Sequence, residues 1–170
     1  MGHVYFIADT HFGVDAIRRY ENRPFPDTAA MDETIIRNWN ETVTDQDEVF
    51  ILGDFGGYGC EQEILFRLNG TKYLVKGNHD TASNRYYRSC GFTEVYDYPI
   101  LYDNFWLLSH EALYINTNMP YANLFGHVHN NPIVRDFSSQ HFCVCVERIQ
   151  YTPIRFDRIR QAIKEAAENE

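Results

Sequence analysis

Short apolar runs rich in Val, Ile, Tyr and Phe recur along the chain, and each is followed by polar residues or glycine. Runs of β-branched and aromatic residues that end at turn-forming residues are typical of β-strands. The strands predicted on this basis are Val4–Ala8, Val49–Leu52, Tyr73–Val75, Phe105–Leu108, Leu124–Phe125 and Phe142–Val146.

Three segments place apolar residues at helical spacing and predict amphipathic helices. The longest begins near Asp27 or Thr28, and its apolar stripe consists of Met31, Ile35, Trp39 and Val43. A shorter helix is expected from about Glu61 to Leu68. The last helix begins at about Asp157, whose carboxylate suits the N-cap position. Its inward-facing residues are Ile159, Ala162, Ile163 and Ala166.

The order of these elements predicts an α/β fold. In the first half, strands alternate with helices, as in a parallel sheet with crossover helices. From Glu94 onward strands predominate, which predicts a second, partly antiparallel sheet. A chain of 170 residues has the size of one domain, so we expect residues 1–170 to form a single domain. The longest apolar run, Val4–Ala8, is far shorter than the roughly 20 residues of a membrane span, so no membrane partner is expected.

The negative net charge of the chain disfavours nucleic acid as a partner. Fifteen Lys and Arg against 24 Asp and Glu give a net charge of −9. Stable binding to nucleic acid requires a basic surface, and the sequence has no basic run, so we do not expect such a partner. The excess acid either keeps the protein soluble or includes metal ligands, and a count does not separate these roles.

The four cysteines do not follow a zinc-binding or CxxC pattern. Cys143 and Cys145 are two residues apart in an apolar run, which places them on one face of the predicted strand. We therefore expect reduced, packed thiols, as in a cytoplasmic protein.

Residues that can bind metal ions gather at the predicted strand ends. Five strands are followed by Asp9-Thr10-His11, Gly53-Asp54, Gly77-Asn78-His79-Asp80, Ser109-His110 and Gly126-His127-Val128-His129. In open α/β sheets, ligands bind beyond the carboxyl ends of the strands, and glycine lets the backbone approach a ligand closely. The sequence therefore predicts a metal site at this edge. His3 and His141 lie outside the pattern and are assigned structural roles.

The mixture of carboxylate, amide and imidazole ligands indicates which metals fit. Such a set, without thiolate, suits Mn, Fe, Zn, Ni or Co better than Ca or Mg. Seven or eight ligands exceed the needs of one ion, so two ions that share a carboxylate are expected. Paired ions about 3.5–4 Å apart generate a bridging hydroxide and clamp the oxygens of an in-line displacement at phosphorus. These residues thus favour phosphoester hydrolysis.

The five blocks between residues 9 and 129 resemble the signature of the calcineurin-like metallophosphoesterases. The resemblance is strongest to small, cap-less bacterial and phage-borne members, which carry similar Asn22-Arg23-Pro24-Phe25 and Met31-Asp32-Glu33-Thr34 segments. It implies a four-layer α-β-β-α sandwich of two mixed β-sheets flanked by helices. It also implies one ion held by Asp9, His11, Asp54 and His129. The second ion would be held by Asp54, Asn78, His110 and His127, with Asp54 bridging the two.

The resemblance also assigns roles beyond the ligands. His79 matches the proton donor that faces the phosphate, and the Asn78 amide can contact both metal and phosphate. Arg85 is either a further phosphate contact or a solvated helix charge. Asp80 either orients His79 or caps the turn. The arginine that follows Gly-Asp-x-x-Asp in protein phosphatases is absent, and the chain lacks the length for a cap domain, so a small phosphodiester is the expected substrate.

Three alternatives compete with a dinuclear phosphohydrolase. Gly56-Gly57-Tyr58-Gly59 could belong to a nucleotide-binding loop, but the third spaced glycine and a Walker lysine are missing. We interpret these glycines as loop flexibility near the metals. A non-catalytic metal-binding scaffold would not require all seven ligands together with His79. A nuclease subunit of a nucleic-acid processing system would be expected to carry a basic surface, although aromatic residues could stack bases.

Overall fold

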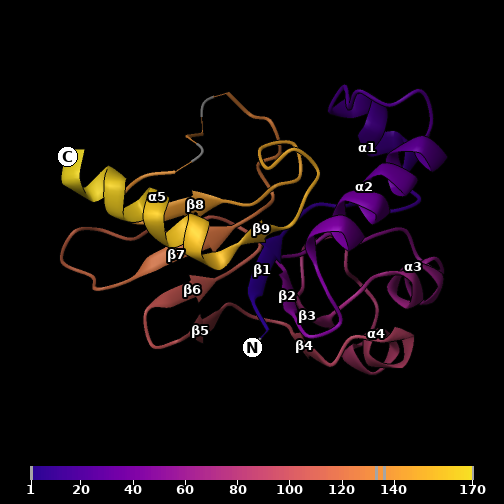
Figure 1. The fold of residues 1–170 in the computed structure, drawn as a ribbon, viewed down its shortest axis with the longest axis horizontal. Helices are drawn as coiled ribbons and strands as arrows, with labels where there is room; N and C mark the ends of the chain where they lie inside the picture. Colours follow the sequence, from indigo (N-terminus) through magenta and orange to yellow (C-terminus); the bar gives the residue numbers. More distant parts are fainter. Residues whose placement is uncertain (1, 133, 136, 170) are drawn as a thin grey trace.

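The first of two β-sheets contains both the first and the last strand of the chain (Figure 1). The computed structural model describes residues 2–132, 134–135 and 137–169. The strand order is β4-β3-β2-β1-β9, in which β1 to β4 are parallel and β9 is antiparallel to β1. The strands are β1 (Val4–Ile7), β2 (Glu48–Ile51), β3 (Thr71–Val75), β4 (Glu94–Tyr96) and β9 (Ile154–Arg155). The predicted parallel sheet is confirmed.

The second sheet has the order β5-β6-β7-β8. Its strands are β5 (Ile100–Tyr102), β6 (Trp106–Leu108), β7 (Ala122–Phe125) and β8 (His141–Cys143). Only β5 is antiparallel to its neighbour, so three strands of this sheet run in the same direction. The expected pair of mixed sheets flanked by helices is therefore confirmed. The short strands β4, β5 and β9 were not predicted, because each has only two or three residues.

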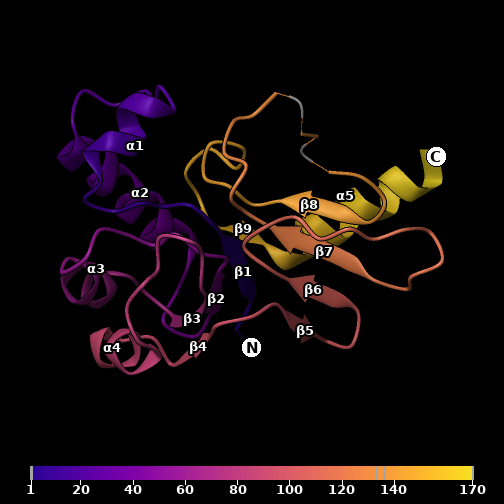
Figure 2. The same ribbon diagram turned by 180° about the vertical axis from the view of Figure 1, so that it is seen from behind.

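Helices α2 (Thr28–Thr42), α3 (Glu61–Arg67) and α4 (Asn84–Cys90) cover one face of the first sheet (Figures 1 and 2). The predicted stripe of α2 is buried, and the Asp27 carboxylate caps this helix by accepting a hydrogen bond from Ala30 N at 2.7 Å. The short helices α1 (Asp15–Tyr20) and α4 were not predicted. Within the described residues, no helix combines the length and apolar character needed to cross a membrane.

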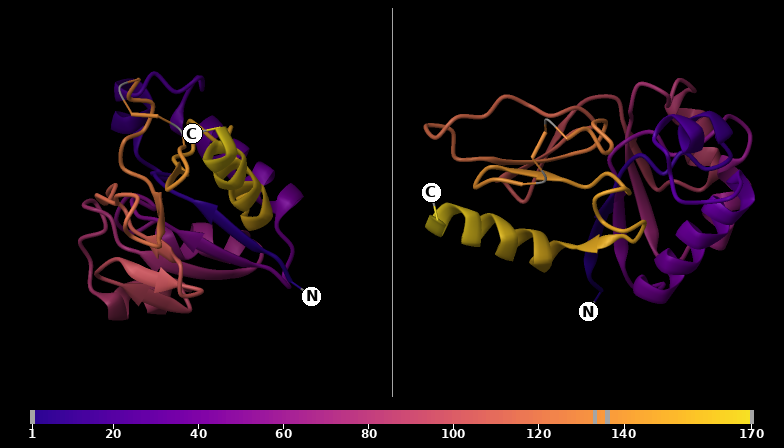
Figure 3. Two further views of the ribbon diagram at one scale, coloured as in Figure 1. Left: turned by 90° about the vertical axis from the view of Figure 1, so that its left-hand side faces the viewer. Right: turned by 90° about the horizontal axis from the view of Figure 1, so that it is seen from above.

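Helix α5 (Phe156–Asn169) lies apart from α2 to α4, alongside the second sheet (Figure 3). The Phe156 ring packs 5.4 Å from that of Phe6 in the first sheet and 5.1 Å from that of Trp106 in the second. Because α5 already begins at Phe156, Asp157 lies inside its first turn. The proposed N-cap role of Asp157 is therefore wrong, and its carboxylate is hydrogen bonded to Arg155.

The two sheets are joined by backbone hydrogen bonds at Ala8, directly after β1. Ala8 N donates to Val144 O at 2.9 Å, and Val146 N donates to Ala8 O at 3.1 Å. This parallel bridge makes β1 and β8 run in the same direction, so the parallel strands of both sheets end on the same side. The predicted strand Phe142–Val146 is thus divided between β8 and this bridge. As a result, the loops after six strands meet at one edge of the molecule.

Trp39 anchors α2 on the first sheet. Its ring is fully buried, and its Nε1 donates to Asn69 O at 3.0 Å. We expect Trp39→Ala to lower the free energy of unfolding by about 3–5 kcal/mol, because the substitution leaves a cavity and an unpaired carbonyl. Chemical denaturation would measure this change. The control is Phe66→Ala on α3, where the ring is 92% exposed and a change within about 0.5 kcal/mol is expected. Equal losses would contradict the assigned packing.

Candidate metal centre

The structure brings all seven predicted metal ligands together at the shared edge. Asp9, His11 and His129 each offer a ligand atom within 4.8 Å of the others, and Asp9, Asp54 and His110 do the same. The remaining two predicted ligands, Asn78 and His127, contact His110. Its Nε2 lies 2.9 Å from Asn78 Oδ1 and 3.1 Å from His127 Nδ1. Residues up to 120 positions apart in the sequence therefore form one cluster.

The backbone at this cluster is held in a conformation that most residues avoid. Five of the seven residues have positive φ angles of 45–68°, namely Asp9, His11, Asp54, His127 and His129. Such left-handed conformations of residues other than glycine cost about 1–3 kcal/mol each and concentrate at functional sites. Packing in the rest of the fold must therefore support this arrangement.

Two glycines allow the loops to approach the carboxylates closely. A Cβ atom at Gly77 would collide with Asp54 Oδ1, and one at Gly126 would lie 2.5 Å from Asp9 Oδ2. The absence of a side chain at these positions leaves room for two hydrogen bonds. His79 N donates to Asp54 Oδ1 at 2.9 Å, and His127 N donates to Asp9 Oδ2 at 2.8 Å. Each carboxylate thus keeps its second oxygen for the cluster.

The first half of the cluster contains lone pairs without partners. Within the described residues, Asp9 Oδ1 and His11 Nε2 are buried and have no hydrogen-bond partner. Burial, together with the nearby charge of Arg23, lowers the pKa of His11 to about 2, so its imidazole is neutral. Burial raises the pKa of Asp9 to about 7, although the charge of His129 opposes this shift. A cation at this position would satisfy both atoms and stabilise the Asp9 carboxylate.

In the second half of the cluster, acceptor atoms of His110, Asn78 and Asp54 lie close together. His110 Nδ1 donates to Leu52 O at 2.9 Å, which leaves its Nε2 without a proton in the neutral ring. Burial lowers the pKa of His110 and so favours the neutral ring. Its Nε2 faces Asn78 Oδ1 at 2.9 Å and Asp54 Oδ2 at 3.5 Å. With the His110 ring neutral, all three of these atoms are acceptors and none can donate to another. Such a group of acceptors fits a metal ion.

Asp54 lies between the two halves. Its Oδ2 is 3.5 Å from His11 Nε2 and 3.5 Å from His110 Nε2. Its other oxygen is fixed by the His79 amide, so the position of Oδ2 is determined by the backbone. One oxygen of Asp54 is thus equally far from His11, in the first half of the cluster, and from His110, in the second half. The residues present therefore fit two cations that share a ligand.

His79 and Asn78 are exposed at the mouth of the cluster. The His79 ring packs edge-on against that of His11, with centroids 5.3 Å apart. Asp80 accepts backbone hydrogen bonds from Asp54, Phe55 and Gly77, so of its two predicted roles it fulfils that of a cap. It binds the loop after β3 to the loop after β2. Arg85 is exposed on α4, which is compatible with both of its predicted roles.

The structure also tests three predictions about residues outside the cluster, which concern two cysteines, one histidine and the glycines after Asp54. Cys143 and Cys145 lie on one face as predicted, with their sulfur atoms 3.3 Å apart. His141 has the expected structural role, with its Nε2 2.9 Å from Leu113 O. The glycines after Asp54 are not a free loop, because Gly57 N donates to Phe12 O at 2.8 Å and Gly56 pairs with Phe12. Our interpretation of these glycines as flexible is therefore wrong.

A buried ion pair that the sequence analysis missed supports the first half of the cluster. The Arg23 side chain is fully buried and donates to the carbonyl oxygens of Asp9 at 2.7 Å and Thr10 at 3.0 Å. It also pairs with Glu147 at 2.7 Å, and Glu147 Oε1 lies 3.1 Å from His129 Nδ1. Because a carboxylate only accepts, the Nδ1 proton of His129 points at Glu147 and its Nε2 is left for the cluster.

The charges around Glu147 keep this carboxylate ionised. Burial raises its pKa, but the hydrogen bond from His129 and the charge of Arg23 outweigh burial and lower the pKa below its ordinary value. Glu147 follows the bridge at Cys145, so it too occupies a strand end. The strand-end pattern that identified the other residues would have found it, had the last strand been included.

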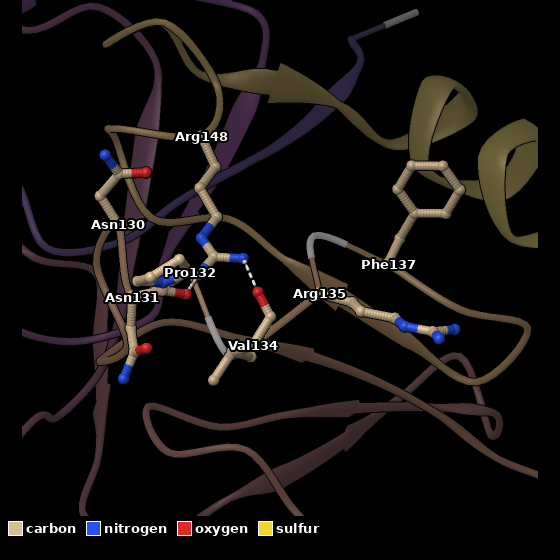
Figure 4. A pocket seen from close by; sticks show the side chains of 7 residues that line it. All are labelled: Asn130, Asn131, Pro132, Val134, Arg135, Phe137 and Arg148. Atoms are coloured by element: carbon tan, nitrogen blue, oxygen red, sulfur yellow. Dashed lines mark hydrogen bonds between the residues drawn. The ribbon is translucent and has the colours of Figure 1, made fainter.

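Arg148 fixes the backbone of the loop that follows His129, and Figure 4 shows its guanidinium beside Asn131 and Val134. Its guanidinium donates to His129 O at 2.6 Å, Val134 O at 2.8 Å and Asn131 O at 2.9 Å. Consecutive residues thus hold His129, since Glu147 binds its ring and Arg148 binds its carbonyl. None of the residues that line the cavity beside Arg148 belongs to the cluster.

Removal of the Glu147 carboxylate should destabilise the protein even without metal. We expect Glu147→Ala to lower the free energy of unfolding by about 3–5 kcal/mol, because it leaves the buried Arg23 unpaired. Glu147→Gln retains an acceptor and should cost less. The control is Glu33→Ala, which breaks an exposed pair with Arg67 and should cost less than about 1 kcal/mol. Denaturation in the presence of chelator would test this, and equal losses at the two positions would refute it.

Comparisons with known proteins identify the family of this chain. The family model described as calcineurin-like phosphoesterase matches residues 2–141. An uncharacterized protein of Methanocaldococcus jannaschii is 30% identical over 176 residues, covering 96% of this chain and 93% of that protein. The gene 66 protein of Mycobacterium phage D29 is 31% identical over 91 residues, or 51% of this chain and 44% of that protein.

A solved structure shows the same fold over almost the whole chain. The crystal structure of a protein of unknown function from Aquifex aeolicus is similar with a TM-score of 0.73 and 26% sequence identity. The similarity covers 95% of this chain and 100% of that one. Together with the matched family model, the chain belongs to the calcineurin-like phosphoesterase family, whose activity is metal-dependent phosphoester hydrolysis.

Proposed function

We propose that this protein is a dinuclear phosphoesterase that hydrolyses small phosphodiesters, with His79 as the proton donor. The observation that carries the proposal is the position of Asp54 Oδ2, 3.5 Å from the Nε2 atoms of both His11 and His110. Two buried atoms without hydrogen-bond partners, Asp9 Oδ1 and His11 Nε2, support it further.

Each ion has a separate ligand set in this proposal. The first would be held by Asp9, His11, Asp54 and His129, and the second by Asp54, Asn78, His110 and His127. The distances within each half of the cluster support this division. The donors are carboxylate, amide and imidazole, which favour Mn, Fe, Zn, Ni or Co. When bound, two such ions activate water for attack at phosphorus and offset the charge of the phosphate.

The residues around the ligands position the substrate and move a proton. The exposed Asn78 amide can donate from its NH₂ to a phosphate oxygen while its Oδ1 remains in the cluster. The imidazole of His79 lies at the mouth and is itself exposed, so it can protonate the departing oxygen and recover a proton from solvent. The hydrogen bond from His79 N to Asp54 Oδ1 fixes the backbone from which the ring projects.

Two features favour a small phosphodiester as the substrate, namely the negative net charge of the chain and the missing arginine after Asp54. A net charge of −9 and the absence of the protein-phosphatase arginine after Asp54 disfavour folded phosphoproteins. The exposed mouth at Asn78 and His79 leaves room for a small diester. Four free cysteines among the described residues support a cytoplasmic setting.

The leaving group provides the test for His79. We expect His79→Ala to lose a factor of about 10²–10⁴ in rate on a dinucleotide diester, because a sugar alkoxide must be protonated as it leaves. The loss should be much smaller on the p-nitrophenyl ester of a mononucleotide, because nitrophenolate is a stable anion. The measurement is kcat/KM for both substrates with Mn²⁺, together with the metal content of the variant.

Asp54→Asn is the matched comparison, since it changes a proposed ligand. It should reduce the rate on both substrates together and lower the bound metal from two equivalents. Equal losses in His79→Ala, accompanied by missing metal, would place His79 among the ligands and overturn its role. Inactivity of the wild-type protein with Mn²⁺, Ni²⁺ and Zn²⁺ on both substrates would overturn the proposed function and favour a scaffold.

A further inference from the structure

An apolar cavity adjoins the candidate metal centre on the side of His79. Its volume is about 240 Å³, and it is lined by His11, Val14, Ala16, Ile17, Tyr20 and His79. Two of these residues, His11 and His79, belong to the site described above. The others come from α1 and the residue before it. The cavity therefore connects the cluster with the apolar side of a surface helix.

The apolar side of α1 does not serve the hydrophobic core. Val14, Ile17 and Tyr20 are three residues apart, which places them on one side of the helix. Among the described residues, they belong to none of the three core clusters, and α1 contains no buried residue. Tyr20 is 82% exposed. Apolar groups held at the mouth of a site without a packing role are available to a ligand.

The polar side of α1 is tied to the protein, so the apolar side keeps its orientation. Arg18 donates to Asp15 at 2.9 Å and to Phe25 O at 3.1 Å. Thr28, the first residue of α2, donates to the same Asp15 carboxylate at 3.0 Å. These bonds connect α1 to α2. The wall of the cavity is thus a fixed part of the structure.

We propose that this cavity binds an aromatic ring carried by the leaving group of the phosphoester. The inference rests on the proposed function, in which His79 protonates the leaving oxygen. A substrate with that oxygen at His79 places the rest of its leaving group beside Ile17 and Tyr20. The ring thereby covers the unpaired side of α1.

The chemistry of the walls selects an aromatic group. Three of the lining side chains are themselves rings, and the described lining residues include no carboxylate, ammonium or guanidinium group. A charged group would lose its hydration there without gaining a carboxylate, ammonium or guanidinium partner. The volume is below the range of about 300–1,000 Å³ that is typical of pockets for drug-sized ligands. It suits a single ring system.

Phenylphosphonate and methylphosphonate separate binding of the ring from binding of the phosphorus group. Both present the same oxygens, and their P–C bonds resist hydrolysis, so affinity is measured without turnover. We expect the Mn²⁺-loaded protein to bind phenylphosphonate at least about tenfold more tightly, because the ring is buried. Isothermal titration calorimetry would measure both affinities.

Two substitutions at Ile17 test the location of the ring. Ile17→Ser removes part of the wall and Ile17→Trp fills the cavity, so each should reduce the preference for the phenyl compound to below about threefold. Phe66→Ser, which changes an exposed apolar residue on α3, is the control and should retain the preference. The metal content of each variant should remain at the wild-type value.

The outcomes distinguish failure of this inference from failure of the proposed function. Equal affinity of the wild-type protein for the two phosphonates would overturn the aromatic cavity and leave the phosphoesterase proposal intact. A phenyl preference that survives both Ile17 substitutions would also overturn it. If neither phosphonate binds to the metal-loaded protein, the phosphorus site itself is refuted, and the cavity proposal falls with it.

Discussion

Backbone pairing between Ala8 and the segment after β8 sets the relative direction of the two sheets and so the position of the candidate site. Two backbone hydrogen bonds, to Val144 O and from Val146 N, join the sheets where β1 ends. Because this bridge is parallel, it places the carboxyl ends of both sheets on one side. Parallel strands alone would bring only neighbouring loops together. The bridge unites the Asp-rich loops of the first sheet with the His-rich loops of the second.

The cluster that results is costly without a cation. It combines five residues with positive φ, two buried acceptors without partners, and a carboxylate whose pKa burial raises to about 7. The fold stabilises this arrangement from outside, through glycines that make room for backbone hydrogen bonds and through the Arg23–Glu147 pair. Arg23 is buried and paired with Glu147 Oε1, whereas Asp9 Oδ1 and His11 Nε2 are buried without a hydrogen-bond partner. This contrast distinguishes a binding site from a packed interior.

Sequence patterns predicted the elements that depend on local chemistry. The long stripe of α2, the parallel order of the first three strands, and the strand-end residues follow from periodicity and from the position of polar residues after apolar runs. The short strands β4, β5 and β9 have too few residues to carry such a pattern. The direction of the second sheet relative to the first is fixed by the bridge at Ala8, which no local pattern encodes.

The supporting residues escaped the sequence analysis for a related reason. Arg23 and Glu147 are 124 positions apart, and in the sequence each is a charged residue of the kind that normally lies on the surface. The burial of Arg23 follows from tertiary packing alone, whereas Glu147 follows a predicted strand and so shares the strand-end pattern. Asp80 illustrates the same limit, because its sequence position allowed two roles, and only the loops it joins distinguish them.

The proposed function requires two metal ions that share Asp54 as a ligand. Electron paramagnetic resonance of chelator-stripped protein, titrated with Mn²⁺, tests this claim most directly. Two Mn²⁺ ions that share a carboxylate are magnetically coupled, so the account predicts the spectrum of an exchange-coupled pair at two equivalents. Signals of isolated Mn²⁺ at every ratio would contradict it.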